Sequence, residues 1–84
     1  MHRPLTFSQH ARDAIDERKL DVAWVKRTIE EPDWIGDDLR PGRRRYFKVI
    51  PEFGNRVLRV VCVENEHERR IITIFFDRDA RQPT

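Results

Sequence analysis

Four polar residues interrupt otherwise apolar faces of predicted helices and strands, and their side chains are the ones that could do chemistry. They are His10, Arg18, Arg59 and Thr73. Burying an Arg or a His costs free energy unless the group is paired. Because these faces belong to elements that should pack together, we expect the four side chains to form one polar site from distant parts of the chain.

These residue types fit the cleavage of a phosphodiester without a metal. An imidazole exchanges a proton near neutral pH, because its unperturbed pKa is about 6.5. A guanidinium binds phosphate through two N–H groups and stabilises charge that develops on it. In RNA, the substrate's own 2′-hydroxyl would be the nucleophile, and a threonine hydroxyl could position a substrate oxygen. We predict that His10, Arg59 and Thr73 are catalytic and that Arg18 binds the substrate.

A strand predicted at residues 43–50 adds three candidates for substrate binding. Tyr46 and Lys48 share one face of it by alternation, so they offer a stacking surface and a cation. Arg45 ends a run of three arginines, of which only part can meet a phosphate because neighbours in a strand point to opposite faces. The sequence has no ligand spacing typical of a metal site and no cofactor motif, so it predicts neither group.

Each candidate also has a purely structural explanation. His10 could bond a backbone carbonyl, and Arg18 could pair with a nearby carboxylate such as Asp21 or Glu17. Arg59 could lie at a sheet edge with its head in water. Thr73 could be present because threonine is favoured in strands.

Length and composition predict a single domain, with an ordered core of about 6–78 and a polar tail at 79–84. Hydrophobic and charged residues each make up 38% of the 84 residues, and the net charge is only +2. The basic residues are fourteen arginines and three lysines. The one cysteine, Cys62, lies in a hydrophobic segment and is expected in the core. With no leader and no membrane-length apolar run, we expect a cytoplasmic protein.

The N-terminal half predicts two helices. Thr6 to Gln9 has the form of a capping box, with Thr6 as N-cap of a helix over 7–19. Arg18 falls near the middle of that helix's apolar face, so we expect it to be at least half buried and bonded. Asp21 should cap a second helix that runs to Glu31, before Pro32.

The C-terminal half predicts strands. Trp34 and Ile35 could form a short strand, and strands are expected at 43–50, 56–64 and 69–77. The strand at 56–64 is apolar on both faces and should be central. Pairing across the turn at 65–68 puts Thr73 opposite Val60 or Cys62, with Ile71 and Phe75 on the face of Thr73. The fold class is α+β, with two N-terminal helices packed on an antiparallel three- to four-stranded sheet.

The order and spacing of several short segments resemble a small bacterial family of unknown function. In the first half these are His10-Ala11-Arg12, Glu17-Arg18-Lys19-Leu20, Val25, Ile29 and Glu31-Pro32. In the second half they are Arg45-Tyr46, Leu58-Arg59-Val60-Val61, Ile72-Thr73-Ile74-Phe75-Phe76 and Asp77-Arg78. The resemblance covers about residues 7–78. It implies that His10, Arg18, Arg59 and Thr73 match the family's recurrent polar positions.

That family resembles the RNA-cleaving toxins with barnase-like, EndoU-like, colicin-type and RelE-like folds, although this chain shows no second catalytic histidine. The resemblance implies a toxin-like ribonuclease, with RNA as substrate and a small acidic antitoxin protein as partner. The alternative is a non-catalytic module of the same fold that binds RNA or a protein. A DNA-binding helix pair is disfavoured, because the second helix carries only Lys26 and Arg27 as cations and ends in Glu30-Glu31.

Overall fold

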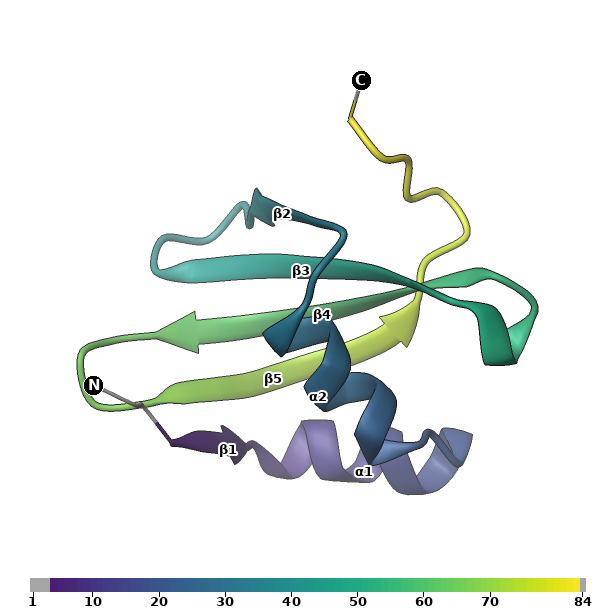
Figure 1. The fold of residues 1–84 in the computed structure, drawn as a ribbon. Coiled ribbons are helices and arrows are strands. Elements are labelled where there is room, and N and C mark those ends of the chain that lie inside the picture. Colours follow the sequence, from purple (N-terminus) through teal and green to yellow (C-terminus); the bar gives the residue numbers. More distant parts are fainter. Residues whose placement is uncertain (1–3, 84) are drawn as a thin grey trace.

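The computed structural model describes residues 4–83 as two helices packed on one five-stranded sheet (Figure 1). The elements are, in chain order, β1 (Leu5–Phe7), α1 (Gln9–Arg18), α2 (Val22–Glu30), β2 (Trp34–Asp37), β3 (Arg43–Ile50), the 3₁₀ turn η1 (Pro51–Phe53), β4 (Arg56–Glu64) and β5 (Arg69–Phe76). The strand order is β1-β5-β4-β3-β2. Among the strands of residues 4–83, only β1 pairs in parallel, with β5. The α+β class is confirmed, with five strands in place of three or four.

The start of α1 differs from the prediction. Ser8, not Thr6, is the N-cap, and its Oγ accepts a hydrogen bond of 3.1 Å from the amide of Ala11. Thr6 instead lies in β1, where its hydroxyl donates a hydrogen bond of 2.9 Å to Glu68. The pairing of β1 with β5 therefore delays the helix by two residues.

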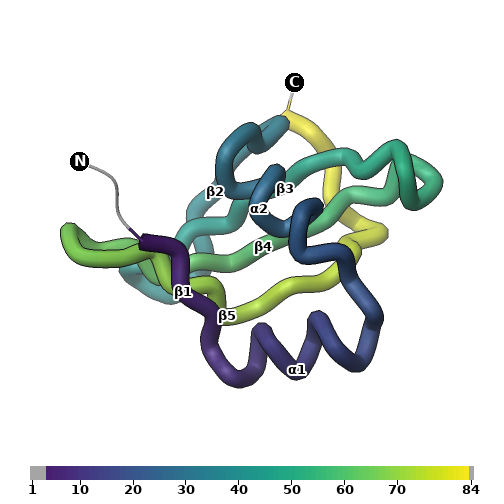
Figure 2. The backbone as a smooth tube through the Cα atoms, turned by 60° about the horizontal axis from the view of Figure 1, so that its bottom comes forward, coloured from purple at the N-terminus to yellow at the C-terminus, as the bar shows by residue number. Residues whose placement is uncertain are grey.

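The second helix begins and ends close to where the sequence predicts. Asp21 is its N-cap and accepts a hydrogen bond of 2.9 Å from the amide of Ala23. The last helical residue is Glu30, two positions before Pro32, whose ring disfavours helical geometry in the residue before it. Figure 2 shows α2 crossing the sheet over β3 and β4, while α1 runs alongside β5.

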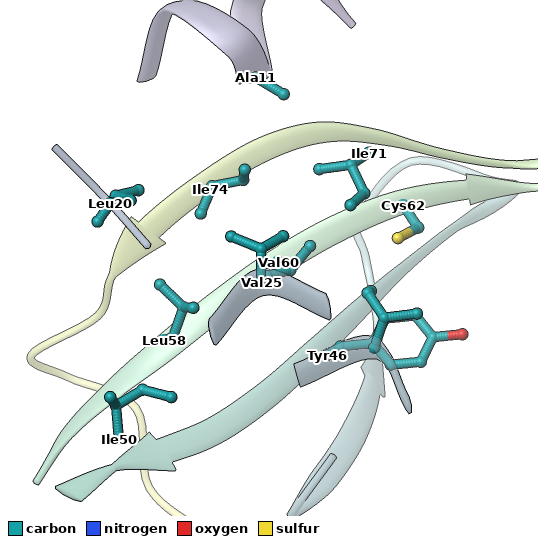
Figure 3. Close-up of a cluster of buried hydrophobic side chains, with 11 residues drawn as sticks. Ala11, Leu20, Val25, Tyr46, Ile50, Leu58, Val60, Cys62, Ile71 and Ile74 are labelled. Carbon is teal, nitrogen blue, oxygen red and sulfur yellow. The ribbon is translucent and has the colours of Figure 1, made fainter. Parts of the chain in front are cut away.

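The core lies between the helices and one face of the sheet (Figure 3). Its buried members are Ala11, Leu20, Val25, Ile29, Tyr46, Ile50, Leu58, Val60, Cys62, Ile71 and Ile74. Cys62 is fully buried, as predicted, and β4 is the central strand of the five. Burial also raises the pKa of the Cys62 thiol to about 12. Within residues 4–83 no helix is both long and apolar enough to cross a membrane.

A β-bulge changes which residues of β5 share a face. Val61 pairs with Thr73 and Cys62 pairs with Ile71, so Ile72 is an extra residue in β5. Because of this extra residue, Ile71 points into the core together with Ile74. The prediction that Ile71 shares a face with Thr73 was therefore wrong.

The opposite face of the sheet carries a row of aromatic rings around one arginine. In register across the strands, Trp34 pairs with Phe47, Phe47 with Arg59, and Arg59 with Phe75. Residues paired in register point to the same side of a sheet. The rings of Trp34 and Phe47 stack with their centroids 4.9 Å apart.

Candidate functional site

A groove between α1 and β5 brings together three of the four polar residues that the sequence singles out. Its volume is about 200 Å³, and it is lined by His10, Asp13, Ala14, Glu17, Arg18, Thr73, Ile74 and Phe75. The helical residues fall at positions i, i+3, i+4, i+7 and i+8, which form one side of a helix. The bulge in β5 leaves Thr73 and Phe75 on the face opposite Ile71, so that they form the strand side of the groove.

His10 is exposed and lies within the groove's row of ionisable side chains. One turn further along the helix is Asp13, which accepts a hydrogen bond of 2.9 Å from the side chain of Gln9. Glu17 lies one turn beyond Asp13, and both carboxylates are exposed. The groove therefore offers an imidazole and two carboxylates, which are group types used in general acid–base catalysis, and a guanidinium, which can bind a phosphate.

Arg18 differs from the prediction, because its side chain is exposed and the described residues provide it with no hydrogen bond or ion pair. The reason is its place at the last helical position of α1, where the helix ends and Lys19 adopts a left-handed conformation with φ 52°. A cation there is favourable for the helix dipole. Its guanidinium is free to meet a ligand.

Arg59 does not line the groove but lies directly behind its wall. Its guanidinium carbon is 4.8 Å from the centroid of the Phe75 ring, and Phe75 lines the groove. Its Nη1 donates a hydrogen bond of 3.1 Å to Oδ2 of Asp77. His10 and Thr73 share one concave surface, whereas Arg59 contacts it only through Phe75.

Asp77 is the ion-pair partner of Arg59 and also organises the chain after β5. Burial alone would raise the pKa of Asp77, but hydrogen bonds from Arg59 and the Asp79 amide, with the charge of Arg59, hold this pKa below its ordinary value. The Asp79 amide is 2.9 Å from Oδ1 of Asp77. The carboxylate is thus ionised and neutralised by Arg59.

The three candidates on β3 are engaged in structural contacts. Tyr46 is only 6% exposed in the core, and its hydroxyl donates a hydrogen bond to Glu64. It has no free ring face for a base, which corrects the expected stacking surface. The reason is that α2 covers this face of β3.

Lys48 and Arg45 are held by neighbouring groups. Lys48 donates a hydrogen bond of 2.7 Å to the carbonyl of Glu31 at the end of α2. Nε of Arg45 is 2.7 Å from Oδ1 of Asp38, and this hydrogen bond holds the pKa of Asp38 below its ordinary value. Neither side chain lines the α1–β5 groove.

A second, larger cavity adjoins the groove and was missed from the sequence. It has a volume of about 640 Å³ and is lined by Arg18, Leu20, Phe53, Asn55, Arg56, Val57, Phe76, Asp77, Arg78, Ala80 and Arg81. Arg18 lines both cavities. The only sequence signal for it is the number of arginines, because its walls come from three separate parts of the chain.

Among residues 4–83, no group of three or more His, Cys, Asp or Glu side chains is placed to hold a metal ion.

The chain belongs to a protein family described as a domain of unknown function (DUF4258), whose model matches residues 7–76. This supports the resemblance to a small family of unknown function. Searches of the curated proteins and of the solved structures found no match.

Proposed function

We propose that this protein is a ribonuclease that cleaves RNA in the α1–β5 groove without a metal ion. The observation that carries the proposal is the shared lining of that groove by His10, Arg18 and Thr73, which come from α1 and β5. These are a proton-transfer group, a phosphate-binding cation and a hydroxyl. The two carboxylates of α1 that line the groove, Asp13 and Glu17, supply a second candidate for proton transfer beside His10.

The reaction would proceed by attack of the 2′-hydroxyl on the adjacent phosphorus. Either His10 or one of the carboxylates Asp13 and Glu17 accepts the 2′-hydroxyl proton as the new O–P bond forms. The bond from phosphorus to the 5′-oxygen then breaks, and that oxygen takes a proton from the other group. The products are a 2′,3′-cyclic phosphate and a 5′-hydroxyl end, and no protein nucleophile is used.

Arg18 and Thr73 would act on the phosphate itself. The unpaired guanidinium of Arg18 can donate two parallel hydrogen bonds to the phosphate oxygens, whose charge grows in the transition state. The Thr73 hydroxyl can donate a third. Arg59 is already neutralised by Asp77, so in this proposal it positions the Phe75 side of the groove rather than the phosphate.

A ribonuclease of this kind would need control in the cell, so we propose a small acidic protein as its neutralising partner. The support is that the four arginines lining the groove and the adjoining cavity form no ion pair within residues 4–83. Induced expression of the wild type alone should arrest growth, whereas His10→Ala should not. Co-expression of the acidic partner should restore growth.

The direct test is cleavage of a fluorogenic single-stranded RNA in EDTA. His10→Ala should remain folded and lose about 10²–10⁴-fold in rate. The matched control is His67→Ala, because His67 is an exposed histidine in the β4–β5 turn and does not line the groove. Thr73→Val keeps the β-branched shape of the side chain but removes the hydroxyl, and its cleavage rate should fall roughly tenfold.

Substrate and product analysis makes the test specific. A 2′-O-methylated RNA should be bound and left intact, because it lacks the attacking hydroxyl. Wild-type protein that leaves RNA intact, or His10→Ala protein that cleaves at the wild-type rate, would refute the proposal. Binding without cleavage would support the non-catalytic module instead.

A further inference from the structure

The cavity at the end of the sheet combines aromatic rings with guanidinium groups that form no ion pair within residues 4–83. We propose that it binds a nucleotide of single-stranded RNA next to the bond that is cleaved, with its phosphate on the arginines and its base on Phe53. This inference rests on the proposed RNA chemistry of the α1–β5 groove. We call the site the arginine cavity and define it by Arg18, Arg56, Arg78, Arg81, Phe53 and Phe76.

The charge of the arginine cavity selects an anion. Four arginines line it, and within residues 4–83 none of them forms an ion pair. The one lining carboxylate, Asp77, is held by Arg59, whose side chain lies outside the cavity. Four positive charges are thus left without compensation around a space of about 640 Å³, within the usual size range of ligand sites.

The aromatic rings of the cavity select a ligand with a flat face. Phe53 is 42% exposed, and its ring stacks on Phe76 with the centroids 4.7 Å apart and the planes 24° apart. The Arg56 guanidinium carbon lies 5.2 Å from the centroid of the Phe53 ring. Aromatic rings beside arginines are the usual surface on which unpaired bases stack and their phosphates are held.

The walls of the cavity are held in place by bonds that do not need a ligand. The carboxylate of Glu52, next to Phe53, accepts two hydrogen bonds of 3.1 and 2.8 Å from Arg27 of α2. On the other side, the Asp77 amide donates a hydrogen bond of 2.9 Å to the carbonyl of Val57. This preformed geometry reduces the cost of ordering the site when a ligand binds.

The position of Arg18 connects the two sites. It lines both the groove and the arginine cavity, so a strand of RNA lying in the groove would continue past Arg18 into the cavity. A free small anion would use the arginines but not the exposed ring of Phe53. The proximity of the groove and the arginine cavity therefore favours a nucleotide within an RNA strand over a free small anion.

The test measures binding of a labelled, 2′-O-methylated single-stranded RNA by fluorescence anisotropy at several salt concentrations, so that cleavage does not interfere. The double variant Arg56→Gln/Arg81→Gln should weaken binding and lower the slope of log K against log salt by about 1.4, since each phosphate contact on a single strand adds about 0.7. The matched control is Arg12→Gln/Arg40→Gln, which removes two exposed charges outside the cavity. The control variant should lower the slope of log K against log salt by less than the cavity variant does.

Base stacking has a separate test. Phe53→Leu keeps an apolar side chain against Phe76 but removes the flat ring, and it should weaken RNA binding roughly tenfold with an unchanged salt slope. Thermal melts of each variant show whether it is folded before binding is compared. An equal loss of RNA affinity in the two double variants, or wild-type affinity in Phe53→Leu, would overturn the assignment of the arginine cavity as an RNA-binding site.

The outcomes separate this inference from the proposed cleavage. If the wild type cleaves RNA and the Arg56→Gln/Arg81→Gln variant binds with wild-type affinity and slope, the arginine cavity is not the site and the ribonuclease stands. If the cavity variants weaken binding but no RNA is cleaved, the cavity stands and the ribonuclease falls. A wild type that binds no RNA would refute both.

Discussion

Removing the Arg59 side chain should destabilise the fold by about 2 kcal/mol. The side chains of Arg59 and Asp77 are 20% and 15% exposed, so their ion pair lies between a surface pair, worth about 0–1 kcal/mol, and a buried pair, whose truncation costs about 3–5 kcal/mol. The contact with the Phe75 ring adds about 0.5–1 kcal/mol. For a domain of this size, such a loss lowers Tm by about 8–16 °C.

The assay unfolds the Arg59→Ala variant in urea and monitors unfolding through tryptophan fluorescence. The matched control is Arg70→Ala, because Arg70 is an exposed arginine of the same strand pair whose side chain forms no hydrogen bond or ion pair with the described residues. It should stay within about 0.5 kcal/mol of the wild type. Combining Arg59→Ala with Asp77→Ala in a double-mutant cycle isolates the pair itself.

The pH dependence gives a second check. The pKa of Asp77 is lower in the folded protein than its ordinary value of 3.8, so its ion pair adds stability that is complete above the unfolded pKa and is lost as the pH falls through the folded pKa. The cost of Arg59→Ala should therefore be full at pH 6 and shrink below about pH 4. A cost near zero at pH 6, or one that does not change with pH, would refute the reasoning.

Two further predictions concern the N-terminal helix and the core. Ser8→Ala should lower the free energy of unfolding by about 1 kcal/mol in denaturant melts, because it removes the α1 cap. An unchanged free energy of unfolding would contradict the assignment of Ser8 as the N-cap. Cys62 should not react with a thiol reagent at pH 8 in the native protein, because burial raises the pKa of its thiol to about 12. It should react once the protein is unfolded. Rapid labelling of the native protein would contradict this prediction.

The sequence predicts the elements well wherever local patterns determine them. Asp21 caps α2, Pro32 follows its end, and the alternation in residues 43–50 places Tyr46 with Ile50 on one face of β3. The α1 boundary is different, because Ser8 and Thr6 are both good caps and the choice between them depends on β1 pairing with β5. That pairing joins residues more than sixty positions apart and leaves no local pattern.

The candidate site could be predicted only in part for a related reason. The sequence indicates that Tyr46 and Lys48 share a face, and they do, but it cannot tell which face of the sheet α2 will cover. Arg18 lies on the apolar side by helical spacing, yet α1 ends there and the side chain is exposed. Residue types thus indicate the chemistry, whereas accessibility depends on packing between distant elements.

The bulge in β5 is the feature that makes the groove possible, and it is invisible in a strand that is apolar on both faces. If Ile72 were an ordinary paired residue and the strand had no bulge, the alternation that buries Ile71 would also bury Thr73. With it, Ile71 and Ile74 both enter the core while Thr73 and Phe75 line the groove beside α1. Bulges are conserved devices for redirecting side chains near functional sites. Deleting Ile72 would make Ile71 and Thr73 neighbours in a regular strand, so Ile71 would still face the core and Thr73 the groove, while the bulge itself would be lost.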